Sequence, residues 1–181
     1  LEAGLDFDAD TVEFGNSGSD TIHTTDYTAT TTRITGNATF TGASYMLPNL
    51  IQTSGNLQGD ADIDVTTQWT WGGGIVSGSG TITNQGTADF TEGSLNRTLV
   101  NTGIFNVNAS TLLMPSGGAI DNRDGASFNL TADSSMGSFN VATVITNAGA
   151  FSKTGGTGIS YIDAVFNSTG TLNLTTGTLN F

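Results

Sequence analysis

One short unit recurs along the second half of the chain, and it constrains the fold more than any other feature. The unit is an aliphatic residue, any residue, Asn, a short turn that contains Gly, and then apolar residues at alternating positions. Its five copies begin at Ile82, Leu99, Ile120, Ile145 and Val165. Apolar residues at every second position are typical of a β-strand, and Asn and Gly are typical of turns. We therefore expect short strands joined by tight turns.

The glycines of these units, together with weaker matches in the first half, set the repeat length. They are Gly36, Gly55, Gly86, Gly103, Gly125, Gly149 and Gly170. The steps between them are 19, 31, 17, 22, 24 and 21 residues, so only the step from Gly55 to Gly86 stands out, as if it contained an insertion. A period of about twenty residues fits one coil of a three-sided solenoid. The sequence predicts a right-handed, three-sided parallel β-helix of about seven coils, in preference to a β-sandwich with a coincidental spacing.

Stacked coils also explain the composition. Gly, Thr, Ser and Asn supply 25, 32, 16 and 16 of the 181 residues, which suits corners and outward strand faces better than helices. The first residues of the five units should form one interior column, and Phe105, Phe128 and Phe151, closed by Leu172, another. Stacked identical amides can bond along a ladder. The expected ladder is Asn84, Asn101, Asn122, Asn147 and Asn167.

The charge balance excludes several classes of function. Four Lys/Arg against sixteen Asp/Glu give a net charge of −12, which is incompatible with neutralising a nucleic-acid backbone or docking on an anionic membrane. Cysteine is absent, so the chain has no disulfide scaffold and no thiolate metal site. No apolar run approaches the ~20 residues that cross a bilayer. We expect no nucleic-acid partner and no direct membrane insertion.

Residues 1–33 differ from the repeats and hold seven of the sixteen carboxylates. We therefore predict an acidic N-terminal cap or inter-subunit segment (1–33) followed by the solenoid domain (34–181). Within the cap, Asp6, Asp8, Asp10 and Glu13 allow a calcium site, because hard cations bind clustered oxygens. We favour an amphipathic edge strand with these carboxylates in water, since an open sheet edge must be charged, capped or paired. No other cofactor is expected.

The long step between Gly55 and Gly86 contains a second candidate site. Spacing of two should place the carboxylates of Asp60, Asp62 and Asp64 on one strand face, and Trp69 and Trp71 together on one face. Indole rings stack on sugars and carboxylates accept bonds from their hydroxyls, so these five residues could form a carbohydrate-binding ledge. The alternative, which we favour, is an insertion whose tryptophans cover the side of the barrel.

An enzymatic role is not expected. The cations Arg33, Arg97, Arg123 and Lys153 do not align in a column, and the single His23 has no evident nucleophile or acid beside it. No facing carboxylate pair of the kind that hydrolyses glycosides is evident. Lys153 occupies an apolar position of its unit, and because Gly155 and Gly156 follow at once, we expect the chain to leave the strand there rather than the amine to reach out at a corner.

The Asn/Gly units and the Gly-rich stretch from Trp71 to Ile82 resemble the degenerate repeats of bacterial surface proteins and autotransporter-type adhesins. The resemblance covers residues 34 to 181. It implies a right-handed parallel β-helix at the cell surface or in the extracellular space. For such a fold we expect a structural or adhesive role. We expect its partners to be surface glycans, other surface proteins, or further copies joined end to end through the solenoid edges into a filament. The alternative function is a carbohydrate-binding or polysaccharide-degrading β-helix.

Overall fold

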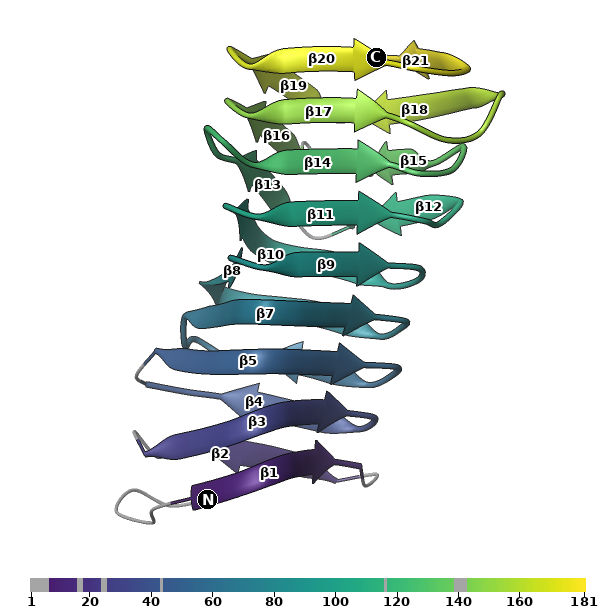
Figure 1. Cartoon of the computed structure of the whole chain (residues 1–181). Helices are drawn as coiled ribbons and strands as arrows, with labels where there is room; N and C mark the ends of the chain where they lie inside the picture. Colours follow the sequence, from purple (N-terminus) through teal and green to yellow (C-terminus); the bar gives the residue numbers. More distant parts are fainter. Residues whose placement is uncertain (1–6, 16–17, 24–25, 43, 116, 139–142) are drawn as a thin grey trace.

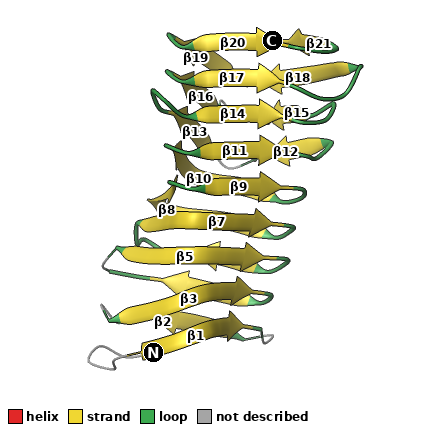
Figure 2. Ribbon diagram, in the orientation of Figure 1, coloured by secondary structure: helices red, strands yellow, loops and turns green. Residues whose placement is uncertain are grey.

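The computed structural model describes the whole chain except residues 1–6, 16–17, 24–25, 43, 116 and 139–142. Its described part contains strands and loops but no helix, and the strands stack as rungs along one axis (Figures 1 and 2). Accordingly, no membrane-spanning helix occurs among the described residues. The absence of helix follows from the Gly, Thr and Asn that interrupt every helical apolar stripe.

The strands follow one another in chain order. The first are β1 (Phe7–Phe14), β2 (Ser19–Ile22), β3 (Tyr27–Ile34), β4 (Asn37–Phe40), β5 (Tyr45–Gln52), β6 (Asn56–Gln58), β7 (Ile63–Trp71) and β8 (Ile75–Asn84). Next come β9 (Thr87–Phe90), β10 (Ser94–Asn101), β11 (Ile104–Val107), β12 (Thr111–Leu113), β13 (Ala119–Asn122) and β14 (Ser127–Leu130). The last are β15 (Ser135–Gly137), β16 (Val144–Asn147), β17 (Ala150–Lys153), β18 (Ile159–Asp163), β19 (Val165–Ser168), β20 (Thr171–Leu174) and β21 (Thr178–Asn180).

Every pairing between these strands is parallel, and the pairs sort into three faces. Face A contains the C-terminal halves of β1, β3, β5 and β7, followed by β9, β11, β14, β17 and β20. Face B contains β2, β4, β6, the N-terminal halves of β8 and β10, and then β12, β15, β18 and β21. Face C contains the N-terminal halves of β1, β3, β5 and β7, the C-terminal halves of β8 and β10, and β13, β16 and β19. The chain is thus a parallel β-solenoid of about nine turns.

The glycines explain why the solenoid has more turns than the predicted seven. Gly36, Gly55, Gly74 and Gly93 stack at the corner between faces A and B, where a Cβ on Gly74 would lie 2.3 Å from the carbonyl oxygen of Gly55. Gly86, Gly103, Gly149 and Gly170 stack at a different corner, between faces C and A. The 31-residue step therefore joins two different corners. The stretch it spans contains regular strands of the solenoid and no insertion.

The predicted boundary at residue 33 is also corrected. It falls inside β3, whose residues pair in register with β1 on one side and β5 on the other. From Phe7 onward the acidic segment therefore forms the first coils instead of a separate cap. Its carboxylates are compatible with the repeat because alternate strand residues point to solvent.

The interior columns follow the predicted pattern with one shift. The rings of Phe105, Phe128 and Phe151 stack with centroids 5.0 and 5.4 Å apart, and Leu172 continues their register. In the aliphatic column, Ile145 is in register with Phe166, while Val165 is 52% exposed. The first part of the last unit, residues 165–167, is therefore displaced by one residue, which turns its side chains to the opposite face, whereas the part after Gly170 stays in register.

Candidate functional site

The corner asparagines form the interior ladder that the repeat predicts, over four of its five members. Nδ2 of Asn84 donates to Oδ1 of Asn101 at 2.8 Å, Asn101 to Asn122 at 2.8 Å, and Asn122 to Asn147 at 2.7 Å. The ladder then ends on the hydroxyl of Ser168, 2.9 Å from Nδ2 of Asn147. Asn167 is exposed and does not join it, because the first part of the last unit is displaced by one residue.

Each ladder amide also bonds the backbone at its corner. Nδ2 of Asn84 donates to the carbonyl oxygens of Gly86 and Ile104, and that of Asn101 to Gly103 and Ser127. A tight bend turns these carbonyls toward the core, where an unpaired polar group costs about 1–3 kcal/mol. The ladder therefore allows the chain to turn sharply between faces C and A.

The ladder begins where the shape of the coil changes. Val65 of β7 is the register partner of Asn84, so Oδ1 of Asn84 faces an apolar neighbour and has no hydrogen-bond partner among the described residues. In the coils that precede Asn84, β1, β3, β5 and β7 each continue from face C to face A as a single strand. From β8 onward, the strand of face C ends at the corner and a separate strand begins on face A.

A second polar ladder lies on the outside of face A, and the sequence reasoning missed it. The carboxylate of Asp89 accepts bonds from Gln68 and Asn106, both at 2.9 Å, and Asn106 accepts one from Asn129 at 3.0 Å. Asp89, Asn106 and Asn129 each stand between the two apolar residues that follow the unit glycine. That shared position was the signal that could have revealed them.

The burial of both tryptophans contradicts the predicted carbohydrate-binding ledge. Trp69 and Trp71 are both fully buried, with their rings parallel and 5.0 Å apart. They point inward from a regular strand of face A, and Trp69 reaches past the small Ala88 of the next coil to contact Phe105, 5.9 Å away. Neither indole is available to stack on a sugar, and neither belongs to an insertion.

Two of the three aspartates near these tryptophans connect neighbouring coils. Asp60 accepts a bond from the backbone N–H of Gly42 at 3.1 Å, and Asp62 accepts bonds from the N–H and hydroxyl of Thr81 at 2.7 and 2.8 Å. The hydrogen bonds from Thr81 hold the pKa of Asp62 below its ordinary value. Asp64 is half-buried. Only Asp64 lies in β7, so the three do not form one row on a strand.

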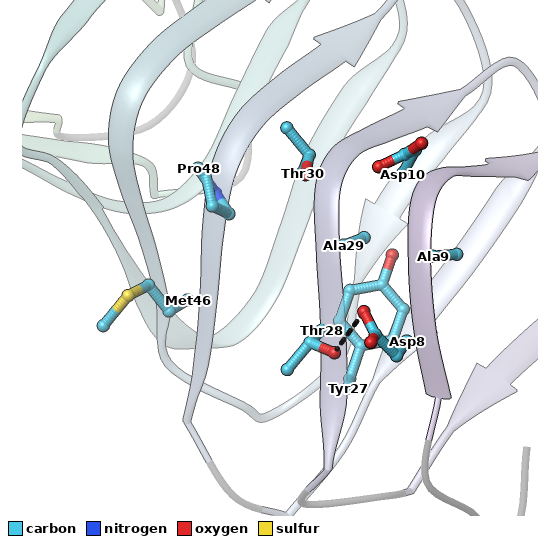
Figure 3. A pocket seen from close by; sticks show the side chains of 9 residues that line it. All are labelled: Asp8, Ala9, Asp10, Tyr27, Thr28, Ala29, Thr30, Met46 and Pro48. Carbon is cyan, nitrogen blue, oxygen red and sulfur yellow. Dashed lines mark hydrogen bonds between the residues drawn. The ribbon is translucent and has the colours of Figure 1, made fainter.

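The acidic residues of β1 line a shallow groove on the outside of face C (Figure 3). Asp8 and Asp10 stand on one side of it, Met46 and Pro48 of β5 on the other, and its volume is about 330 Å³. The hydroxyl of Thr28, between them, donates to Asp8 at 3.5 Å. Asp8 and Asp10 are exposed, as expected of a solvated edge strand.

The predicted calcium ligands are only partly described. Asp6 lies outside the described residues, and Glu13 is exposed on β1, where it accepts a bond from Thr35 at 3.2 Å. No group of three or more His, Cys, Asp or Glu side chains that could hold a metal ion occurs in the part of the chain that the structure describes. A calcium site at these residues therefore has no support from the geometry of the described members.

Two of the four cations are buried structural groups. The guanidinium of Arg97 donates to the carbonyl oxygens of Gly80, Ala61, Thr81 and Ser77 at 2.7 to 3.3 Å. It thereby binds the inward-facing carbonyls of two coils between faces B and C. Burial lowers the pKa of Arg97 to about 10, which the nearby Asp62 carboxylate partly opposes, so the side chain stays charged near neutral pH.

Lys153 remains in its strand, contrary to our expectation. It is fully buried at the end of β17, and Nζ reaches the corner, where it contacts Asp133 at 2.7 Å and the carbonyl oxygen of Gly155 at 2.8 Å. Asp133 also accepts a bond from the backbone N–H of Gly158. The hydrogen bond from Lys153 is the main reason why the pKa of Asp133 lies below its ordinary value. The amine does not reach out into solvent either, because its Nζ is enclosed by Asp133 and the carbonyl oxygens of Ala132 and Gly155.

His23 and Arg123 both lie at the surface. His23 is exposed, and its Nδ1 shares a hydrogen bond with the hydroxyl of Thr41. Arg123 is exposed and pairs with Asp121 at 2.8 Å on the surface. The fold and these surfaces define the class, a parallel β-solenoid with internal polar ladders. Comparison with protein-family models, curated proteins and solved structures gave no significant match.

Proposed function

We propose that this solenoid is a non-enzymatic structural or adhesive segment of an extracellular bacterial protein, either at the cell surface or in a self-assembling filament. The observation that carries the proposal is the parallel stacking of strands along all three faces, reinforced by the Asn84-to-Asn147 ladder inside. Coils spaced by about 4.8 Å give a stack roughly 40 Å high. Each coil contacts only its neighbours, so such a stack is a stiff spacer that presents its outer faces along its length.

The positions of the cations weigh against the alternative of a polysaccharide-degrading β-helix. Such chemistry on an acidic polymer needs accessible cations or paired carboxylates on neighbouring coils. Arg97 and Lys153 are committed to carbonyls and Asp133 in the interior. Arg123 is paired with Asp121. The chemistry of the described residues thus favours presentation and binding over catalysis.

Surface display tests this proposal. The chain would be expressed on a bacterial surface between an outer-membrane anchor and a distal epitope tag. We expect the tag to be bound by antibody, the segment to resist protease, and the cells to adhere to glycan- or protein-coated surfaces more than cells that carry the anchor alone. Rapid proteolysis together with adherence equal to the anchor control would contradict both the structural and the adhesive role.

Self-assembly end to end needs a different experiment from simple truncation. Removing residues 1–33 would cut through β3 and expose the edge of another coil of the same kind, so it would not remove an interface. Charging an exposed apolar side chain of β20, as in Leu172→Glu, disturbs packing against a further coil without shortening the stack. We expect filaments seen by electron microscopy to disappear in this variant. Filaments of unchanged length would contradict assembly through that edge.

A further inference from the structure

A second groove lies on the outside of face B, where the loops after β7, β9 and β11 meet β8, β10 and β12. Its volume is about 510 Å³, within the range of small-ligand sites. Residues of three consecutive coils line it, so the rigid stack of parallel strands fixes its shape. The groove is separate from the Asp8 and Asp10 groove of the first coils.

The lining combines apolar and polar groups in one small area. Ile75 and Leu113 are 37% and 42% exposed, and both are register partners of Ser94, which lies between them. Around this apolar strip stand the carboxylate of Glu92 and the hydroxyls of Thr91, Ser94, Ser110 and Thr111. Within the described structure, none of these five polar groups has a side-chain hydrogen bond to protein, so all can bond a ligand.

A buried, unpartnered donor lies directly beneath this groove. Gly93 lines the groove, and a Cβ placed on it would lie 2.6 Å from Nε1 of Trp71. Trp71 is fully buried, and its Nε1 has no hydrogen-bond partner among the described residues. Buried indole N–H groups normally find a partner, and an exception needs an explanation. Nε1 of Trp69 likewise has no hydrogen-bond partner among the described residues, whereas that of Trp71 lies next to Gly93, a residue of the groove lining.

We propose that this groove binds a pyranose unit of a neutral glycan. A pyranose has apolar C–H faces that fit over Ile75 and Leu113, and hydroxyls that can donate to the Glu92 carboxylate and exchange bonds with the surrounding hydroxyls. The net charge of −12 and the carboxylate in the groove disfavour an acidic sugar. The inference rests on the adhesive form of the proposed function and names its ligand class.

The test begins with an array of neutral, amino and acidic linear oligosaccharides probed with the full chain. The neutral oligosaccharide retained best is then titrated by calorimetry into the wild type, Glu92→Gln, and Glu13→Gln as the matched control on another face. Because Trp69 and Trp71 are the only tryptophans, their emission gives a second readout of groove occupancy. Unfolding midpoints of all three proteins establish that the substitutions leave the fold intact.

We expect Glu92→Gln to weaken binding about tenfold, since a hydrogen bond to a charged group contributes about 1.5–3 kcal/mol. Glu13→Gln should bind like the wild type, and tryptophan emission should change on saturation. The proposal is overturned if no neutral glycan is retained, if Glu92→Gln binds with unchanged affinity, or if binding leaves the emission unaltered. Continued adherence and protease resistance of the displayed chain would then show that only the groove assignment had failed.

Discussion

At the scale of single residues, the interior of this solenoid depends on polar side chains that are fully committed to neighbouring coils. Asn122 is the clearest case, because its amide donates to Asn147 and to the carbonyl of Ala150 while its oxygen accepts from Asn101. The charged side chains of Lys153 and Arg97 also bond groups of neighbouring coils. In each case the side chain satisfies backbone or amide groups that the corners turn inward, where water cannot reach them.

Asn122→Ala should destabilise the chain by about 2–3 kcal/mol, because it leaves Nδ2 of Asn101 and the carbonyl of Ala150 without their buried partner. The urea midpoint, followed by circular dichroism, measures the loss. Asn108→Ala is the matched control, since Asn108 is exposed on a loop. Equal midpoints for the two variants would show that the ladder contributes no stability.

The ion pair between Lys153 and Asp133 predicts that the stability of the fold depends on pH. The pKa of Asp133 in the folded chain lies below its ordinary value of 3.8, so its contribution is complete above that value and is lost as the pH falls through the folded pKa. Asp133→Asn should lower the Tm at neutral pH and show less further loss below pH 4 than the wild type. Parallel Tm curves for the two proteins between pH 2 and 7 would refute this role for the carboxylate.

At the scale of elements, successive corners of the stack lie so close together that little space is left for side chains. Gly55, Gly74 and Gly93 lie one above another, and each has a positive φ. A side chain at such a corner would meet the carbonyl of the coil below as well as the backbone strain of the left-handed region. Glycine at these three positions is therefore favoured for two separate reasons.

Two substitutions separate these reasons. Gly74 and Gly42 have φ of 87° and 86°, but a Cβ at Gly74 would lie 2.3 Å from the Gly55 carbonyl oxygen, whereas nothing lies within 4 Å at Gly42. Gly42→Ala should cost only the conformational strain, about 1–2 kcal/mol. Gly74→Ala should cost clearly more, measured again by the urea midpoint. Similar losses would mean that the coils separate freely enough to admit the methyl group.

At the scale of the whole molecule, the solenoid should behave as a stack of nearest-neighbour units. Val107 and Leu130 are register partners one coil apart, so deletion of residues 108–130 removes one coil and joins equivalent positions. This shortened chain should fold with a similar strand signal and slightly lower stability. Deletion of residues 109–130 shifts the following strands by one residue and points their apolar side chains outward.

Circular dichroism and limited proteolysis distinguish the two deletions. We expect the 108–130 deletion to remain protease-resistant and the 109–130 deletion to be degraded or aggregated. If both fold equally well, register with the neighbouring coil does not control the stack. If neither folds, the coils are not interchangeable units and the nearest-neighbour description is wrong.

Much of this architecture could be predicted from the sequence, because the Asn-to-Gly units repeat at the period of one coil. The aromatic column through Phe105, Phe128 and Phe151 and the ladder from Asn84 to Asn147 both follow from stacking identical positions. The outer Asp89 ladder could have been found by the same alignment. The repeat was harder to recognise in the first half of the chain because Gly36 and Gly55 lie at the corner between faces A and B, and the unit there lacks the Asn before its Gly.

The sequence by itself determined that the chain forms short parallel strands in coils of about twenty residues, since spacing in sequence fixes which residues repeat. Only the tertiary structure decided which side of a strand faces the core where the repeat is irregular. It assigned Gly55 and Gly86 to different corners, turned Trp69 and Trp71 inward and kept Lys153 in its strand beside Asp133. The physical reason is that a period of two gives two equivalent faces, and only contact with the neighbouring coils distinguishes the buried face from the exposed one.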